Sequence, residues 1–286
     1  MKKHLLSVAV LASMTCGFSA MAADDADIDM SNPTDVYTSL GASYGSEGAN
    51  IKAQLMLSEK TATSGQKTGI IFEAKNLFDE GDKTPQFTGM VAHPDYGMVP
   101  TFNDETSKRS FRLRYGTINT TNGTGWSIDA ILADHPFYGN MAVIQAGPVM
   151  TIPVTDNFYI WPILYAGAVV VEDNMSQILP PNMAGSTAVS SSGIDVPSLI
   201  MTGMVYARYA FNDNWWTLVS ASYTDELQGK GWSDDIMDGG LQMASFSGEI
   251  SVAYQMNKRQ NVRVNYKTDN SDSTDDSYWI EYNHAF

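Results

Sequence analysis

The C-terminal half of the chain alternates apolar and polar residues with a period of two. In "NVRVNYK", Val262, Val264 and Tyr266 share one side of an extended chain, and polar or charged residues occupy the other side. The last ten residues, "SYWIEYNHAF", repeat this alternation as far as the terminal Phe286. Such a pattern is typical of β-strands that have one face in an apolar medium and the other in a polar one.

The same alternation recurs along most of the chain and predicts twelve strands. Ten or fourteen strands are the alternatives, because residues 77–107 have room for a further hairpin and the strands in the middle of the chain are poorly patterned. The twelve predicted strands cover residues 36–44, 51–57, 67–76, 110–116, 126–132, 141–154, 157–171, 198–211, 214–224, 243–256, 261–267 and 277–286.

The connections between the predicted strands are of two kinds. Short ones with turn-forming residues, such as "VTDN" and "FNDN", alternate with long ones. With an even number of strands, the short turns lie at one end together with both termini, and the long loops lie at the other end. Outer-membrane barrels are built in this way, so we predict an all-β fold, a transmembrane antiparallel up-and-down barrel. The short connections are residues 154–157, 211–214 and 257–260, and the long ones are residues 77–107, 172–197 and 225–241.

The beginning of the chain has the features of a secretory signal peptide. A basic "MKK" precedes the apolar "LLSVAVLASM", and small residues lead to a cleavage site after Ala22. Cys16 raises the alternative of a lipoprotein, but the preceding Met14 and Thr15 do not fit a lipidation site. Cleavage removes this single Cys and two Lys, which takes the net charge from −15 to −17. The predicted parts are a signal peptide (1–22), a short periplasmic N-terminal segment (23–34) and the barrel (35–286).

The C-terminal strand resembles the sorting signal of Gram-negative outer-membrane β-barrel proteins, in which a terminal Phe closes a run of alternating aromatic and apolar residues. The matching residues are Tyr278, Ile280, Tyr282 and Phe286, whereas His284 is polar where an apolar residue is commoner. The resemblance implies recognition by the barrel assembly machinery, pairing with the first strand, and location in the outer membrane. Outer-membrane lipid and lipopolysaccharide are then further partners.

Aromatic residues beside the short turns agree with this assignment, because such barrels carry an aromatic girdle at each headgroup level. The strands between them have apolar inner faces, which offer a surface for a loop folded into the lumen or a path for a partly hydrophobic solute. The predicted girdle residues are Phe158, Tyr159, Phe211, Trp215, Trp216 and Phe286, and the apolar inner face is assigned to Pro162, Leu164, Ala166, Ala168 and Met204.

Strand parity places more cations than carboxylates on the inner wall of an otherwise acidic protein. A cationic lumen attracts anionic solutes, so we predict a narrow channel for small, anionic solutes, restricted by residues 77–107 and by a second flap at 176–193. Alternatively, the charges pair and plug the lumen, which favours a structural or adhesive barrel with no open pore. The predicted lining is Lys52, Lys75, Arg112, Arg114, Arg208, Arg263 and Lys267, opposed by Glu73, Asp129, Glu249 and Glu281.

The acidic residues gather in the predicted outer loops, and this acidic surface argues against nucleic acid as a partner. In "TDNSDSTDD", four carboxylates have the oxygen ligands that suit Ca²⁺, but the spacing of an EF-hand loop is missing. A solvated hairpin loop is the alternative, and no other cofactor is predicted. The four residues are Asp269, Asp272, Asp275 and Asp276.

Two histidines lie in a repeated phrase, "HPDYG" with His93 and "HPFYG" with His135. Both phrases fall in outer loops, where they form either a ligand or metal site above the mouth or simply two similar turns. A membrane-embedded lipid hydrolase would need such a His. Because the chain has no nucleophile elbow, we expect that it is not an enzyme, and we expect His284 to be an interfacial side chain.

Overall fold

The computed structural model describes residues 28–46, 48–60, 65–78, 87–93, 97–102, 109–135, 139–172, 194–229, 245–270 and 276–286. Within these ranges every regular element is a β-strand. The described part of the chain contains no helix with the length and apolar character needed to cross a membrane.

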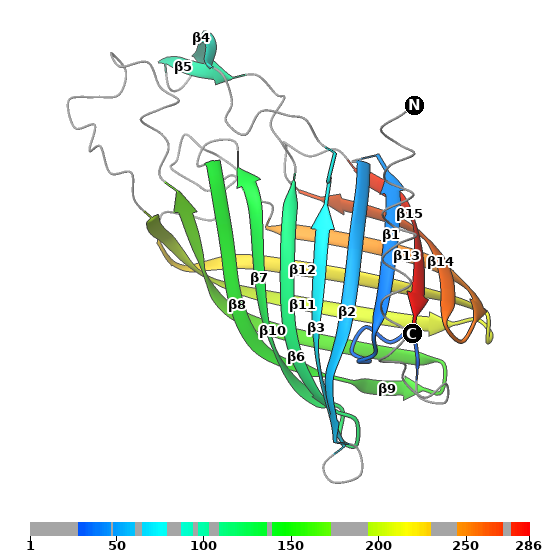
Figure 1. Ribbon diagram of the computed structural model, residues 1–286. Coiled ribbons are helices and arrows are strands. Elements are labelled where there is room, and N and C mark those ends of the chain that lie inside the picture. Colours follow the sequence, from blue (N-terminus) through cyan, green and yellow to red (C-terminus); the bar gives the residue numbers. More distant parts are fainter. Residues whose placement is uncertain are drawn as a thin grey trace.

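Twelve strands form one closed antiparallel ring, as predicted (Figure 1). Each strand pairs with the next along the chain, and β9 continues the path of β8 after an interruption at Thr151. The strands of the ring are β1 (Ser39–Gly45), β2 (Gly48–Lys60), β3 (Gln66–Lys75), β6 (Ser110–Asn119), β7 (Thr124–His135), β8 (Gly139–Met150) with β9 (Ile152–Thr155), β10 (Phe158–Glu172), β11 (Ile194–Ala210), β12 (Trp215–Gly229), β13 (Phe246–Asn257), β14 (Gln260–Asp269) and β15 (Ser277–Ala285).

The ring closes between the first and the last strand. β1 and β15 are antiparallel, in a register that runs from Ser39 opposite Ala285 to Gly45 opposite Trp279. Beyond the last paired residue, the backbone N–H of Phe286 donates to the carbonyl oxygen of Thr38 at 2.9 Å. The expected pairing of the C-terminal strand with strand one is therefore confirmed, and it closes the sheet into a ring.

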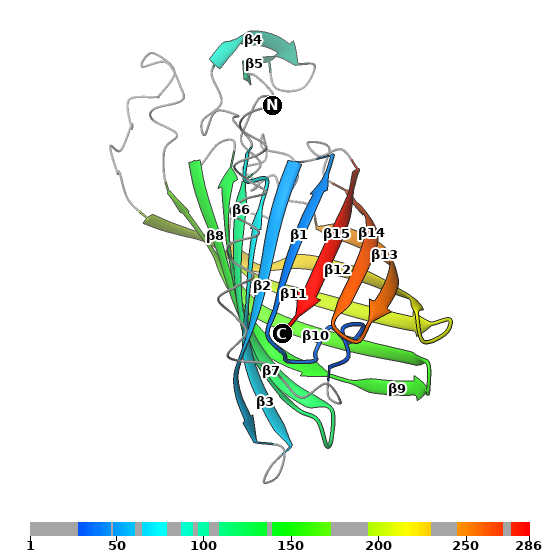
Figure 2. The ribbon, with the colours of Figure 1, turned by 45° about the vertical axis from the view of Figure 1, so that its right-hand side comes forward.

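All of the long connections lie at one end of the barrel, as predicted, although this end also has two short links, 46–47 and 136–138. We call this end the loop end, and the other end, where the C-terminus lies, the short-turn end (Figures 1 and 2). The short-turn end has the links 61–65, 120–123, 156–157, 211–214 and 258–259, and the loop end has the links 46–47, 76–109, 136–138, 173–193, 230–245 and 270–276.

Residues 77–107 contain the hairpin that was considered from the sequence. Its strands, β4 (Phe87–His93) and β5 (Gly97–Phe102), pair only with each other. Figures 1 and 2 show this hairpin beyond the loop end and outside the ring, so the barrel keeps twelve strands. The rest of the predicted constriction loop and the predicted flap at 176–193 lie outside the described residues.

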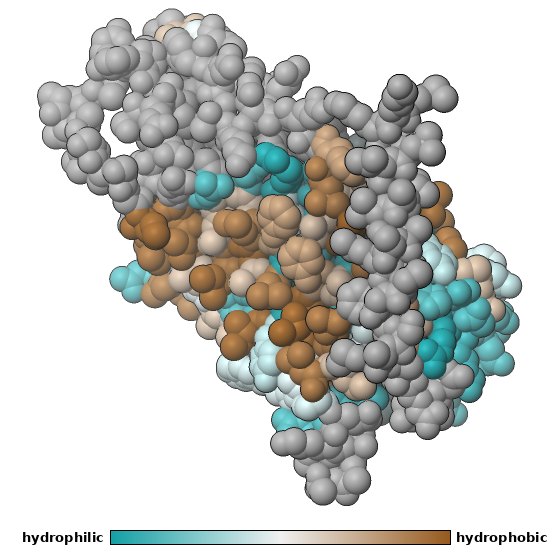
Figure 3. All heavy atoms as spheres, viewed as in Figure 1, coloured by the Kyte–Doolittle hydropathy of each residue, from teal (hydrophilic) through white to brown (hydrophobic). Residues whose placement is uncertain are grey.

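The outer face of the ring is a belt of exposed apolar side chains, seen in Figure 3 as a brown surface over the strands. Burial alternates along the first part of β6, where Phe111, Leu113 and Tyr115 are exposed and the two arginines between them are not. Water penalises apolar surface by about 25 cal/mol per Å², whereas lipid tails do not. The chain is therefore a membrane-spanning barrel of the outer-membrane type. The belt includes Leu113, Ile128, Leu132, Ile144, Leu164, Val219, Ile250, Val264 and Ile280.

Two of the aromatic residues predicted for the girdle turn inward instead. Trp216 is only 3% exposed, and the ring of Tyr159 lies under the guanidinium of Arg208. Trp215, by contrast, is exposed on the outer face. The physical reason is parity, since adjacent residues of one strand point to opposite faces. Only one of the two neighbouring tryptophans can therefore meet lipid.

The inner face of β10 was assigned to the wrong residues. Leu164 is 51% exposed on the outer face, and Ala166 is exposed as well. Trp161 and Tyr165 are fully buried instead and point inward. Both faces of this strand are apolar, so alternation alone could not choose between them, and the bulky rings fill the lumen rather than meeting lipid. Pro162 and Ala168 share the outer parity of Leu164, and the predicted inward position holds for Met204, which packs against the inner cluster.

Val219 lies midway between the exposed aromatics Trp215 and Tyr223 of β12, at the centre of the belt. We expect Val219→Arg to destabilise the barrel by about 2–4 kcal/mol, because it places a charge among lipid tails. Ser220→Arg is the matched control, because Ser220, the next residue along the strand, faces the lumen opposite Glu249. Denaturant unfolding in lipid vesicles measures both variants, and equal losses would contradict the assignment of faces.

Candidate functional site

The inner wall brings oppositely charged residues into a row across three strands. Lys52 of β2 lies opposite Glu73 of β3, which lies opposite Arg112 of β6. The Nζ atom of Lys52 is 3.4 Å from Oε1 of Glu73. Side chains in directly opposed positions have Cβ atoms about 4.5–5.5 Å apart, so the fold itself places a carboxylate between two cations.

Asp129 of β7 joins this row to a second arginine. Arg112 donates two hydrogen bonds to the Asp129 carboxylate, from Nε to Oδ1 at 2.8 Å and from Nη2 to Oδ2 at 2.6 Å. Arg114 lies further away, with Nη2 at 3.8 Å from Oδ2. Gln145 of β8 donates to the same oxygen at 3.3 Å. The Asp129 side chain is fully buried, and a paired, hydrogen-bonded carboxylate is the form in which such burial is tolerated.

A second charged group lies on β14 and β15, which are separated from β2 by β1 alone. Arg263 of β14 is 3.8 Å from Oε1 of Glu281 on β15, and its guanidinium lies over the ring of Trp216 at 4.9 Å from the centroid. Cations over aromatic faces are stabilised by the ring quadrupole. Trp216 thus serves the inner wall rather than the membrane interface.

The remaining predicted lining residues are spread around the ring. Lys75 lies over the ring of Trp279 at 5.9 Å, and Lys267 forms an ion pair with Asp269 at 3.2 Å. Glu249 faces Lys267 in register. All of the predicted lining residues share the strand parity opposite to the apolar belt, and their role in a pore remains a prediction.

One inward cation was missed from the sequence. Lys67 has the same parity on β3 as Glu73 and Lys75, and it is buried. The shared parity of Lys67, Glu73 and Lys75 could have indicated that Lys67 faces the lumen, but both faces of this strand were interpreted as apolar. Nζ of Lys67 lies 3.5 Å from Oδ1 of Asp35, a residue of the segment that precedes the barrel.

Residues 28–38, which we call the N-terminal segment, cross the lumen at the short-turn end. In Figures 1 and 2 this segment is the dark blue loop beside the C-terminus. On one side, the carbonyl oxygen of Met30 accepts a hydrogen bond from Arg263 Nη2 at 2.9 Å. Nearby, Arg208 Nη1 is 3.4 Å from Oδ2 of Asp29. The N-terminal segment thereby supplies partners for Arg263 and Arg208, two of the cations predicted to line the pore.

The other side of the N-terminal segment contacts β2 and β3. Gln54 Nε2 donates to the carbonyl oxygen of Asp35 at 2.8 Å. Burial raises the pKa of the Asp35 carboxyl above its usual value, and Lys67 offsets part of this effect. Val36 packs into the hollow above Gly69, where an added Cβ would lie 2.6 Å from Val36 Cγ1. The first strand was predicted to begin at Val36, and this is wrong because β1 begins only at Ser39.

Two successive turns give the N-terminal segment its shape. The Asp29 carboxylate accepts from the backbone N–H of Ser31 at 3.0 Å, and Asn32 Oδ1 accepts from the backbone N–H of Thr34 at 2.9 Å. Such side-chain-to-backbone bonds are the usual property of Asp and Asn in turns. The predicted periplasmic segment 23–34 is described from Ile28 onward, and there it folds back against the inner wall.

Apolar side chains narrow the lumen further along β7 to β11. One cluster consists of Met141, Val143, Val169, Val171 and Ile200, with Ile131 packed against it. A second contains Tyr165 and receives Val36 from the N-terminal segment. The sequence did not reveal these clusters, because the same strands also present apolar residues to lipid.

The residues of the predicted sorting signal lie at the closing strand. Tyr278, Ile280 and Tyr282 are exposed on the outer face, while Phe286 is buried and packs edge-on against His284. Gln260 Nε2 lies 3.1 Å from His284 Nδ1. The structure thus places His284 on the outer side at the short-turn end, and the sorting role stays a prediction.

The predicted calcium cluster and the histidine repeat are described only in part. Asp269 pairs with Lys267, and Asp276 accepts a hydrogen bond from the hydroxyl of Tyr266 at 2.5 Å. Asp272 and Asp275 lie outside the described residues, as do the side chains of His93 and His135. Among the described residues, no three potential metal ligands come together.

Comparisons with known proteins agree with the barrel fold. No protein-family model and no curated protein match the sequence. An outer membrane channel from Pseudomonas putida F1 superposes with a TM-score of 0.51 at 8% identity, over 91% of this chain and 99% of that chain. The NanC porin and the KdgM porin in complex with oligogalacturonate have TM-scores of 0.46 and 0.43, each at 8% identity, over 87% and 88% of this chain and 98% and 99% of theirs. At these identities the likeness concerns the fold alone.

Asp129 is expected to be the most sensitive polar position of the wall. Asp129→Asn leaves Arg112 and Arg114 without their carboxylate, and removing one partner of a buried pair typically costs about 3–5 kcal/mol. Chemical unfolding in detergent measures the loss. The double variant Arg112→Gln/Asp129→Asn removes both partners and should recover part of it. A single variant as stable as the parent would show that the pair does not hold the wall together.

Proposed function

We propose that this barrel lets small solutes pass passively across the outer membrane, with a preference for anions. The observation that carries the proposal is the charged row on the inner wall formed by Lys52, Glu73, Arg112, Asp129 and Arg114, which holds three cations and two carboxylates. Of the four carboxylates predicted for the lining, three lie within ion-pair distance of an inward cation. The charged row keeps one positive charge, because Arg112 and Arg114 share the single carboxylate of Asp129. This charge lies in a confined space, where fields are focused.

The size of the ring supports passage of small solutes only. Eight-stranded barrels are filled by their own side chains, and sixteen-stranded barrels leave an aqueous channel. A ring of twelve lies between these limits, and here the inner clusters and the N-terminal segment occupy part of the space. The fold shared with the channel from Pseudomonas putida F1 is a further support.

A barrel closed to solutes is the second candidate. The N-terminal segment is the observation that favours it, because its contacts reach β2 and β3 on one side and β11 and β14 on the other. In that case the barrel serves a structural or adhesive function, and the charges of the wall stabilise a plug. Conductance separates the two candidates directly.

The selectivity test changes the net charge of the inner wall without removing only one partner of a buried ion pair. Arg112→Gln/Arg114→Gln/Asp129→Asn removes two cations and one anion, so the reversal potential in a salt gradient across a planar bilayer should shift toward cations. The matched control, Lys52→Gln/Glu73→Gln, removes one charge of each sign and should leave the reversal potential unchanged. Equal reversal potentials in all three proteins would refute the anion preference.

The second test concerns the N-terminal segment. Deletion of residues 28–36 should raise single-channel conductance several-fold, because the segment fills the lumen at the short-turn end. The deletion also removes Asp29 and Asp35, so Asp156→Asn/Asp213→Asn in the exposed turns at the same end is the charge control. If neither the parent nor the deletion variant passes current, the barrel is closed and the channel proposal fails.

A further inference from the structure

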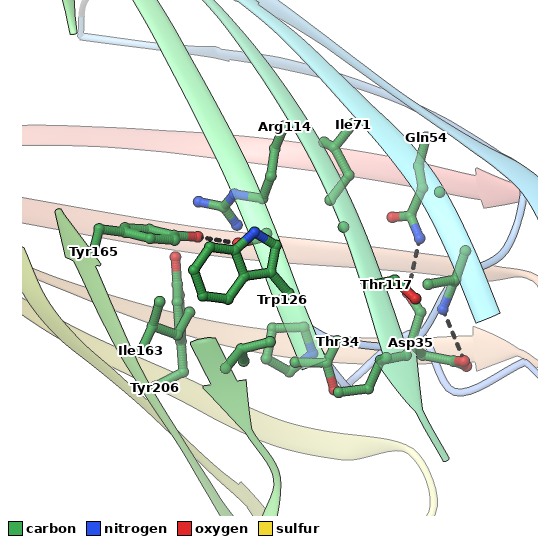
Figure 4. Close-up of a pocket in the computed structure, with 17 residues that line it drawn as sticks. Thr34, Asp35, Gln54, Ile71, Arg114, Thr117, Trp126, Ile163, Tyr165 and Tyr206 are labelled. Atoms are coloured by element: carbon green, nitrogen blue, oxygen red, sulfur yellow. Dashed lines mark hydrogen bonds between the residues drawn. The ribbon is translucent and has the colours of Figure 1, made fainter. Parts of the chain in front are cut away.

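We propose that the lumen holds a binding subsite for a short aliphatic monocarboxylate, with Arg114 as its cation. This inference rests on the proposed function and names a class of solute for it. The subsite is a cavity of about 70 Å³ between the inner wall and residues 33–36 of the N-terminal segment (Figure 4).

Of the two arginines that share Asp129, Arg114 is the less completely paired. Arg112 takes both oxygens of Asp129, while Arg114 reaches the same carboxylate only at 3.8 Å. The Nε and Nη2 atoms of Arg114 are buried, and no described residue accepts a hydrogen bond from them. A guanidinium has no acceptor of its own, and a buried donor without a partner costs about 1–3 kcal/mol. A bound carboxylate would satisfy both donors and the charge.

Asp35, the other charged residue that lines the cavity, does not accept a hydrogen bond from Arg114. Its Oδ1 atom accepts from the backbone N–H of Val36 at 2.9 Å and lies 3.5 Å from Lys67. In Figure 4, Asp35 and Arg114 stand at opposite ends of the cavity. The acceptor that Arg114 lacks must therefore come from a molecule that enters the lumen.

Two tyrosines lie close to Arg114. The hydroxyl of Tyr165 is hydrogen-bonded to Ser127 Oγ at 2.5 Å, and Figure 4 shows the hydroxyl of Tyr206 directed toward the same place. A phenolic hydroxyl both donates and accepts, so Tyr206 offers a second contact to a carboxylate held by Arg114.

The rest of the lining is mainly apolar, apart from Thr34, Gln54 and Thr117, and favours a hydrocarbon tail. Ile71, Ile163 and Val36 form part of the apolar lining. A cavity that holds one water molecule has a volume of about 10–15 Å³. The cavity of about 70 Å³ therefore has room for roughly five to seven non-hydrogen atoms of the size of a water oxygen. That size matches propionate or butyrate. A divalent anion is disfavoured because one leftover cation cannot neutralise two charges.

Butyrate binding to the purified full-length barrel in detergent, measured by isothermal titration calorimetry, tests the inference. We expect saturable binding with one site per chain, at least tenfold weaker binding for Arg114→Gln, and partial recovery in Arg114→Lys. Butyramide has the same shape without the charge and should bind at least tenfold more weakly than butyrate to the parent protein. Lys258→Gln removes an exposed cation at the short-turn end and should leave the affinity unchanged.

The inference is overturned if the parent protein does not bind butyrate, if butyramide binds equally well, or if Arg114→Gln retains the parent affinity. Should Arg114→Gln fail to fold, as judged by heat-modifiable gel migration, the butyrate and butyramide comparison on the parent protein still decides. Conductance keeps the two proposals apart. Current without butyrate binding removes the subsite alone, whereas butyrate binding without current removes the channel and leaves the subsite.

Discussion

The hydrogen bonding of the backbone in hydrocarbon is the constraint on which the rest of this structure depends. Each unpaired N–H or C=O in a bilayer costs several kcal/mol, so a sheet can span only if it has no edge. The pairing of β1 with β15 meets this condition. Closure in turn divides the side chains into two sets by parity, one set against lipid and one set inside a narrow space.

The interior charges follow from that division. Polar residues that alternate with lipid-facing ones must point into the lumen, where an unpaired charge is costly. Asp129 between Arg112 and Arg114, and Glu281 beside Arg263, show how the wall resolves this cost. Arg208 and Arg263 reach further and bind the N-terminal segment. The electrostatics of the wall and the filling of the lumen are thus parts of one arrangement.

The sequence made the strands and their order predictable, because alternation reports directly on the boundary between lipid and water. Where both faces of a strand are apolar, the alternation did not predict which residues face the lumen. Leu164 and Tyr165 are equally apolar in pattern, and only the space inside the ring decides that Tyr165 turns inward. Lys67 was within reach of a parity argument, whereas the position of Val36 was not. The contacts of Val36 depend on Gly69 and on strands far away in the sequence, which local periodicity does not encode.

The hydrogen bond from Phe286 to Thr38 has a consequence for biogenesis. Met30 and Tyr37 pack against Ala285, so the docking surface of the N-terminal segment includes the very end of the chain. That surface does not exist while the nascent sheet is open, and it appears only when the last strand meets the first. Docking of the segment therefore stabilises the closed barrel relative to an open sheet.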